Sequence, residues 1–593
     1  MDSSSPSTRS EYRIRFYDAL PLMTAGLILV LYVLAYFKAM EYVWIPLLIA
    51  LGSGAYRVIR SRSFDKDDVI GVVAFVLLCL ITAILIKDHV VKWWDDMNYW
   101  ATDAKALYYL NGFTGKYGNV APEFGDYPPG IQIVKWCALK LSPHIYKEGL
   151  AFVGYTLMNM IFMLPLMRAV DRMKLPVRIG WMIVIMLIPG IVNDVWSYGA
   201  CADVTMGIVY GAMLLGIYEI ATKGDREQEF LPYIKVALYG AVTALCKNTG
   251  FMWVTFAVIL LIISCVAYKK NAKYTFITIL FVYMIQGSWW ANCILNRRIA
   301  KLTGALARTA TGGGMIMPED ASDKLRYYVF GFLKEPMHTT HTWVLDISAF
   351  VMFLAIVITF GVLYKTRKKD MTGPLFVYSI ITGIAIYVIV LLSHMSIFAT
   401  ETQYGSSDVM AISISRYGAP FTIGTFMVLI CVLTDSLRSK VEIDTETDMD
   451  DIERNEINDR SVIIGLVSIA VFILLTTDYP AYGYLLGGYR GDRDVDMKNR
   501  AEMIDQEGQE YIDYLHNLPE DKYDFVKGHR VLFFRDGSRI HWLNDTYINY
   551  EVAPIATVYA SYDESMTEAE VNEIISTSHA DYVYRDGVMT AAK

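Results

Sequence analysis

Residues 68–100 read DVIGVVAFVLLCLITAILIKDHVVKWWDDMNYW, and this stretch decides the fold class of the whole chain. Its first part is apolar over about 20 residues, the length that crosses the ~30 Å hydrocarbon core of a bilayer at 1.5 Å per residue. The part that follows holds three tryptophans and the adjacent Asp95 and Asp96. The stretch therefore predicts a membrane span that ends in an acidic, aromatic loop at the membrane surface.

Apolar runs of similar length recur along the chain, which has 593 residues, 54% hydrophobic and only 19% charged. Soluble proteins carry about 25% charged residues. We therefore predict an all-α polytopic membrane protein with about thirteen transmembrane helices. The expected spans are 17–37, 41–56, 68–87, 149–168, 178–195, 202–221, 231–247, 250–268, 273–292, 346–364, 375–396, 417–435 and 461–477. The net charge of −8 argues against a nucleic-acid-binding protein, which would show a basic stripe.

Lysine and arginine collect in the loops on one side of these spans. Such clusters mark the cytoplasmic side of a membrane. The N-terminus is therefore expected in the cytoplasm, and the chain reads as a multi-pass plasma-membrane protein, of bacterial type. The clusters are Arg9, Arg13 and Arg15; Arg57, Arg60, Arg62 and Lys66; Arg168, Arg172, Lys174 and Arg178; Lys269, Lys270 and Lys273; and Lys365, Arg367, Lys368 and Lys369.

Three parts follow from this topology. Residues 1–67 form a cytoplasmic tail and two additional spans, and residues 68–477 form the main transmembrane domain with outer loops 88–148 and 293–345. Residues 478–593 have few apolar runs and predict a small extracytoplasmic α/β domain. Its expected elements are helices at 494–516 and 567–578 and strands at 530–534, 556–561 and 581–584.

The first outer loop holds the strongest candidates for chemistry. Asp95 and Asp96 are carboxylates that can act as a general base, or as ligands if a divalent cation such as Mg²⁺ or Mn²⁺ takes part; no cofactor is certain. Residues 99–110, which include Lys105, have one apolar face and predict a helix lying on the membrane. The GDYPPG turn at 125–130 then fixes Asp126 and Tyr127 through its prolines. We expect Lys105, Asp126 and Tyr127 to contact substrate.

Further polar residues are expected at the outer ends of later spans. Charged side chains cost free energy inside a bilayer, so a set of acids and bases on one side indicates a pocket. Lysine offers a phosphate a point charge, and arginine offers a bidentate fork. The set predicts group transfer from a lipid phosphate, and its members are Asp203, Lys247, Asn248, Glu401, Arg416 and Tyr417.

These motifs, in this order, resemble the GT-C superfamily of membrane glycosyltransferases, which includes aminoarabinose transferases and protein O-mannosyltransferases. The resemblance covers residues 68–480 and rests on the acidic pair after a span, DYPPG, Ala202-Asp203, KNTG at 247–250, and RYGAP at 416–420. One difference is that two spans precede the span that leads to the acidic loop, whereas in the family that loop commonly follows the first span.

The resemblance implies inverting transfer of a sugar from a polyprenyl-phosphate donor to a glycan, lipid or protein of the cell envelope. It implies that Asp95 or Asp96 is the general base, with Asp96 preferred, and that Lys247 and Arg416 stabilise the departing lipid phosphate. Two alternatives are a transporter or flippase of lipid-linked glycans, which would place ionisable residues near mid-span, and a non-catalytic scaffold.

Overall fold

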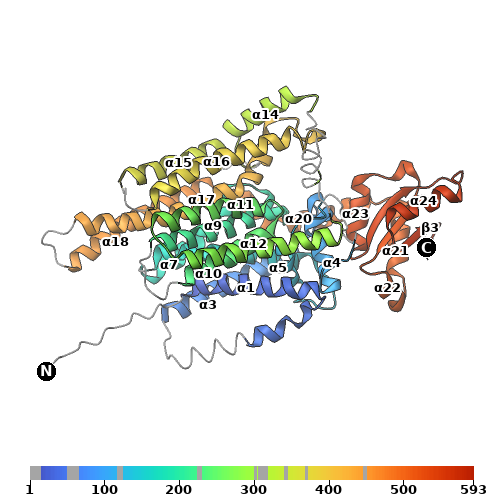
Figure 1. Ribbon diagram of the computed structural model, residues 1–593, viewed down its shortest axis with the longest axis horizontal. Coiled ribbons are helices and arrows are strands. Elements are labelled where there is room, and N and C mark those ends of the chain that lie inside the picture. The colour runs from blue at the N-terminus through green and yellow to red at the C-terminus, as the bar shows by residue number, and fades with distance from the viewer. Residues whose placement is uncertain are drawn as a thin grey trace.

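The computed structural model shows a long helical bundle with a small sheet-containing domain at one end (Figure 1). It describes residues 15–49, 66–116, 124–171, 173–222, 230–298, 304, 318–338, 345–366, 371–444 and 451–592. Among these residues, nine helices are long and apolar enough to cross a membrane. They are α1 (Phe16–Tyr36), α3 (Lys66–Ile86), α6 (Glu148–Met163) with its continuation η3 (Leu164–Val170), α9 (Ala202–Thr222), α11 (Gly250–Ala267), α12 (Ala272–Leu295), α15 (Ala349–Thr366), α16 (Thr372–His394) and α17 (Ser407–Asp444).

A tenth crossing is formed if α18 (Asp451–Thr476) is counted with the helix after it, from which it is bent by 77°. The expected number of thirteen crossings is not confirmed. Three of the predicted spans correspond to apolar helices of only 10 to 17 residues, shorter than the ~20 that a span needs. These are Met40–Ile49, α7 (Leu175–Ile185) and α10 (Phe230–Cys246), and residues 50–56 of the second predicted span lie outside the described part of the chain.

Helix α9 lies at the centre of the bundle, and its apolar residues are buried all round. It packs along α17 at close range because glycine removes the side chain at the contact. A Cβ atom on Gly207 would come within 2.9 Å of the carbonyl oxygen of Ala419. The close approach places the start of α9 beside the part of α17 that carries Arg416.

The described parts of the first loop, 88–116 and 124–148, form short helices that pack on the bundle. They are η2 (Asp96–Trp100), α4 (Thr102–Leu110) and α5 (Gly130–Leu139). The prediction that the apolar face of the helix at 99–110 lies on the membrane is wrong. Ala104 and Tyr108 on this face pack against Leu139 and Ala151 of the protein. An apolar stripe fits a protein groove as well as a bilayer.

The C-terminal domain is α/β, as predicted. After α19 (Tyr479–Gly483), η6 (Tyr484–Gly488) and α20 (Tyr489–Glu502) come α21 (Gln506–His516), α22 (Glu520–Val526), β1 (Arg530–Arg535), η7 (Gly537–Arg539), α23 (Trp542–Val552), β2 (Ala556–Ser561), α24 (Glu568–Ser578), β3 (Tyr582–Arg585) and β4 (Val588–Ala591). The sheet order is β2-β1-β3-β4, with β4 antiparallel to β3 and the other pairs parallel. Strand β4 and helices α22 and α23 were not predicted, and the single helix predicted over 494–516 is divided between α20 and α21.

The two ends of the bundle differ in what they carry. The C-terminal domain, red in Figure 1, lies at one end, and the C-terminal end of α17 and the start of α18 lie at the other. Helix α14 (Ala321–Leu333) and η5 (Thr402–Tyr404) complete the described elements near the pocket discussed below. The predicted domain boundaries at 67 and 477 remain predictions.

Candidate functional site

A cavity of about 340 Å³ opens in the bundle near the C-terminal domain, whose Trp542 contacts Trp94 of the cavity wall. Its wall combines residues of the first loop, the segment 247–249 after α10, and the segment 397–404 after α16 with residues of α9, α11, α16 and α17. The lining residues are Trp94, Asp95, Trp100, Phe124, Tyr127, Asp203, Lys247, Asn248, Thr249, Phe251, Met252, Trp253, Ile386, Ile389, Val390, Ser393, Ile397, Phe398, Glu401, Gln403, Tyr404, Arg416 and Tyr417.

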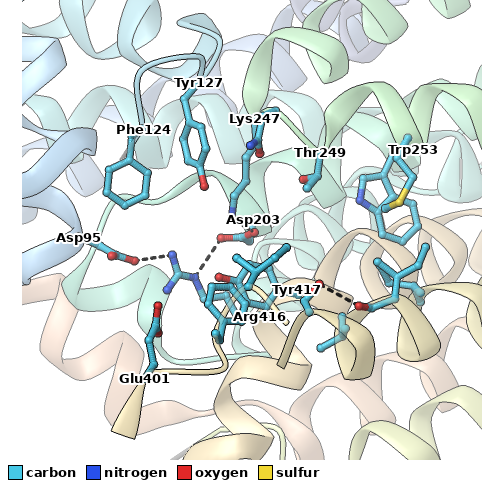
Figure 2. A pocket seen from close by; sticks show the side chains of 18 of the residues that line it. Asp95, Phe124, Tyr127, Asp203, Lys247, Thr249, Trp253, Glu401, Arg416 and Tyr417 are labelled. Atoms are coloured by element: carbon cyan, nitrogen blue, oxygen red, sulfur yellow. Dashed lines mark hydrogen bonds and ion pairs between the residues drawn. The ribbon is translucent and has the colours of Figure 1, made fainter. Parts of the chain in front are cut away.

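Four charged side chains form a continuous ionic row at one end of this cavity (Figure 2). The Arg416 guanidinium donates to the Asp95 carboxylate at 2.6 Å through Nη2 and to Asp203 at 3.0 Å through Nε. The Lys247 ammonium donates to the other oxygen of Asp203 at 2.7 Å. We call Asp95, Arg416, Asp203 and Lys247 the pocket cluster. Its two acids and two bases balance, which lowers the cost of burying them.

The local structure explains why these residues meet. Asp203 stands in the first turn of α9, where the partial positive charge of the helix N-terminus favours an acid. Lys247 follows the last residue of α10, where the partial negative charge favours a base. Gly130, at the start of α5, packs so closely on the end of α10 that a Cβ atom would lie 2.7 Å from the carbonyl oxygen of Leu245. The GDYPPG turn is thereby held beside Lys247.

Asp96 has a different environment from its neighbour Asp95. It begins η2, a single turn of π-helix, an irregularity that is frequent at functional sites. Asp96 is fully buried, and both of its carboxylate oxygens accept from the Ala200 N–H, at 3.0 and 3.1 Å. Burial raises the pKa of Asp96 against the opposing charge of Lys135.

Lys135 completes this arrangement from α5. Its buried ammonium donates to the carbonyl oxygens of Trp100 at 2.8 Å and Ala200 at 2.7 Å. Asp96 and Lys135 therefore bind the two sides of the same Ala200 backbone unit. Together they tie η2 to the loop before α9, which fixes the segment that carries Asp95.

Aromatic rings and an amide surround the pocket cluster. The Lys247 ammonium lies 4.7 Å from the centroid of the Tyr417 ring, and the Arg416 guanidinium lies 4.7 Å from that of Trp93. Both side-chain polar atoms of Asn248 are buried and have no hydrogen-bond partner among the described residues. Buried polar atoms are normally paired, so this amide fits contact with a bound ligand.

The opposite end of the cavity is apolar. Figure 2 shows Asp95 and Trp253 on opposite sides of the view. The apolar lining comes from α11 and α16 and includes Met252, Ile386 and Val390. Ile389 on this wall is 37% exposed, so the apolar end of the cavity lies close to the outer surface of α16. One cavity thus joins a charged end to an apolar end.

Most of the residues proposed from the sequence line this cavity. They are Asp95, Tyr127, Asp203, Lys247, Asn248, Glu401, Arg416 and Tyr417. Three others lie outside the lining. Asp96 bonds to Ala200 as described, Asp126 is buried and its carbonyl oxygen accepts from the Trp289 indole, and Lys105 donates to the carbonyl oxygens of Tyr550 and Glu551 in the C-terminal domain.

Sequence reasoning missed Lys135 and the apolar lining. A lysine inside the apolar run GIQIVKWCAL is a signal that could have drawn attention to position 135. The apolar residues of α11 and α16 had no such signal, because they look like any other lipid-facing or core residue of a membrane span.

The described residues do not build a metal site around the acidic pair. No group of three or more His, Cys, Asp or Glu side chains is placed to hold a metal ion within the described ranges. Asp95 bonds to Arg416 while Asp96 bonds to Ala200, so the two carboxylates do not converge on one point. Divalent-cation dependence remains an expectation from the sequence.

The fold and the cavity define a multi-pass membrane protein whose buried pocket is charged at one end and apolar at the other.

No family model matches the chain, and no curated protein matches it. Solved structures do match. ArnT from Cupriavidus metallidurans bound to undecaprenyl phosphate is 12% identical over 86% of this chain and 88% of that chain, with a TM-score of 0.45. ArnT in the apo state is 12% identical over 86% and 92%, with a TM-score of 0.43. The likeness concerns the arrangement of helices.

Proposed function

We propose that this protein is a membrane glycosyltransferase that transfers a sugar from a polyprenyl-phosphate donor to a cell-envelope acceptor. The observation that carries the proposal is the cavity itself. Its charged end holds two cations for a phosphate, and its apolar end, between α11 and α16, offers a surface for an isoprenoid chain. A polyprenyl-phosphate sugar has the same two-part chemistry. The sequence motifs point to the same donor.

The donor phosphate is expected to bind between Lys247 and Arg416. Charge-assisted hydrogen bonds to phosphate are about twice as strong as neutral ones, and arginine can bind two phosphate oxygens at once. The incoming phosphate competes with Asp95 for Arg416. Asp203 keeps both cations in place, because it bonds to each of them.

Asp95 is our preferred general base, because it lines the cavity while Asp96 lies behind it. The Asp95 carboxylate takes the proton of an acceptor hydroxyl as that oxygen forms a bond to the anomeric carbon. The bond from the anomeric carbon to the phosphate oxygen breaks, and its electron pair leaves with the polyprenyl phosphate, which Lys247 and Arg416 stabilise. One such displacement inverts the anomeric configuration.

Two observations together support an outer location for the pocket. The pocket and the C-terminal domain lie at the same end of the bundle, since Trp94 of the cavity wall contacts Trp542 of that domain. The basic loops of the sequence favour a cytoplasmic N-terminus. We therefore place the transfer, and the C-terminal domain, on the outer face of the plasma membrane.

The test is sugar transfer in membranes that contain the full-length chain. Membranes receive a panel of radiolabelled polyprenyl-phosphate sugars, and both transfer to endogenous acceptors and release of polyprenyl phosphate are measured. Asp95→Asn is expected to lower kcat by roughly 10²- to 10⁴-fold, the usual contribution of a general base. Asp96→Asn is expected to act less, by loosening η2. Transfer by Asp95→Asn at the wild-type rate would remove Asp95 from the mechanism.

The same assay separates the transferase from a transporter of lipid-linked glycans. A transporter moves its lipid intact, so the labelled sugar stays on the polyprenyl phosphate and crosses the membrane. A transferase releases one polyprenyl phosphate for every sugar that it transfers. Movement of the intact donor without release of polyprenyl phosphate would contradict the proposed function.

A further inference from the structure

Helix α23 of the C-terminal domain reaches the wall of the pocket. Its first residue, Trp542, meets Trp94 in a perpendicular ring contact, with centroids 5.7 Å apart at 82°. Trp94 lines the cavity and directly precedes Asp95 in the chain. Trp542 is nevertheless 58% exposed, so most of its indole surface faces outward. An exposed aromatic surface thus adjoins the residue that we propose as the base.

Buried and half-buried charges hold α23 in this position. The Lys105 ammonium donates to the carbonyl oxygens of Tyr550 and Glu551, at 2.8 and 2.9 Å, near the end of α23. Arg500 lies between the carboxylates of Glu148 and Glu551, with contacts of 2.9 and 3.3 Å. Glu148 belongs to α6, so these contacts fasten the C-terminal domain to the transmembrane bundle. These contacts fix α23, and the ring contact with Trp94 orients the indole of Trp542, which reduces the entropy lost when a ligand binds to it.

We propose that Trp94 and Trp542 form the subsite for the acceptor and that the acceptor is a carbohydrate. The C–H groups on one face of a sugar ring are apolar and weakly positive, and they complement the negative face of an indole ring. If a sugar ring of the acceptor lies on Trp542, hydroxyl groups of the acceptor would lie near Trp94 and Asp95. Glu401 and Gln403 line the same cavity and offer hydrogen bonds to hydroxyl groups.

This inference rests on the proposed function and names the acceptor class of the same site. Two other roles for Trp542 predict different effects of its substitution. A tryptophan that merely anchors the domain at the membrane interface would affect the lipid donor rather than the acceptor. A tryptophan that merely packs would affect stability, and an indole that is mostly exposed contributes little to that.

The first experiment measures both substrates separately with the full-length protein in lipid nanodiscs. Trp542→Ala is expected to raise the KM for the acceptor about tenfold, the scale of one lost aromatic contact, and to leave the KM for the donor and the melting temperature unchanged. Trp542→Phe should recover part of the loss. The matched control is Phe525→Ala, because Phe525 is an aromatic residue of the same domain that is 70% exposed in α22; its kinetics should equal the wild type. An unchanged acceptor KM in Trp542→Ala, or a raised donor KM instead, would overturn the inference.

The second experiment does not depend on turnover. Full-length protein is bound to an array of defined oligosaccharides, without donor. The wild type and Asp95→Asn are expected to bind the same oligosaccharides, and Trp542→Ala should lose about 90% of that binding, following the tenfold estimate. Absence of binding by the wild type, or equal binding by Trp542→Ala, would overturn the carbohydrate subsite. Failure of the proposed function is seen elsewhere, in the absence of donor cleavage.

Discussion

The bundle carries a second, partly buried ionic cluster, and the comparison with the pocket cluster shows what makes a charged group functional. We call Asp18, Arg168, Glu219, Lys235 and Asp435 the distal cluster. Lys235 pairs with Asp18 and Glu219, and Arg168 pairs with Glu219 at 3.0 Å and Asp435 at 3.2 Å. Both clusters are made mainly by α9, α10 and α17, with the distal residues at the other ends of these helices.

Helix α9 alone shows the distance between the clusters. Asp203 stands in its first turn and Glu219 near its end, sixteen residues or about 24 Å of helix apart. Both carboxylates are buried and each receives hydrogen bonds from two basic side chains. By charge pairing alone, the two clusters cannot be told apart.

The two clusters differ in whether a cavity lies beside them. The pocket cluster faces a cavity that continues into the apolar space between α11 and α16. None of the distal residues lines that cavity. A buried ion pair is therefore weak evidence of function, and the pocket beside it is stronger evidence. The distal cluster fits a structural role, joining α1, η3, α9, α10 and α17 at the end of the bundle away from the C-terminal domain.

The largest expected effect separates the clusters by activity. Arg416→Met removes a cation that stabilises the departing phosphate, and loss of one such contact typically costs 10²- to 10³-fold in rate. We expect a loss of this size in kcat/KM for the donor. The matched change in the distal cluster is Arg168→Met, and the rate per folded molecule should stay within about twofold of the wild type. An equal loss in both variants would abolish the distinction.

The next effect separates them by stability. Lys235→Met leaves Asp18 and Glu219 without a shared cation, and breaking a buried pair in this way costs about 3–5 kcal/mol. The variant is expected to unfold at a lower temperature while keeping its catalytic rate. Thermal unfolding in detergent measures the stability, and the transfer assay on the fraction that stays folded measures the catalytic rate. A lost rate with unchanged stability would give Lys235 a functional role and contradict the account.

The smallest effect tests the apolar end of the cavity. Ile389→Trp adds bulk to the wall on α16 and should raise the KM for a long-chain polyprenyl donor several-fold, since one poor apolar fit costs about 1–3 kcal/mol. A water-soluble short-chain analogue should bind as before. Ile381→Trp is the control, because Ile381 is 59% exposed on the same helix and does not line the cavity. Equal effects on both donors would show that the chain lies elsewhere.

Much of the membrane domain was predictable because apolar length is a local property. The pocket residues at helix ends were also predictable, since a charge such as Asp203 or Lys247 beside a membrane span costs free energy and stands out. The number of membrane crossings was harder to predict, because α7 and α10 are apolar but short. Length alone does not decide whether such a helix crosses the membrane.

Contacts between distant segments could not be predicted. Lys135 bonds to the backbone of Trp100 and Ala200, 35 and 65 residues away, and backbone partners leave no pattern in a sequence. The apolar face of α4 was assigned to the membrane because amphipathicity does not identify the partner. Trp542 became informative only once the docked α23 placed it against Trp94.

The most direct test of the central claim is a cryo-electron microscopy structure of the Asp95→Asn variant with a polyprenyl-phosphate sugar. The account predicts the phosphate between Lys247 and Arg416, the anomeric carbon facing position 95, and the isoprenoid chain between α11 and α16. A phosphate beside Lys235 and Arg168, in the distal cluster, or an isoprenoid chain bound away from α11 and α16, would contradict it.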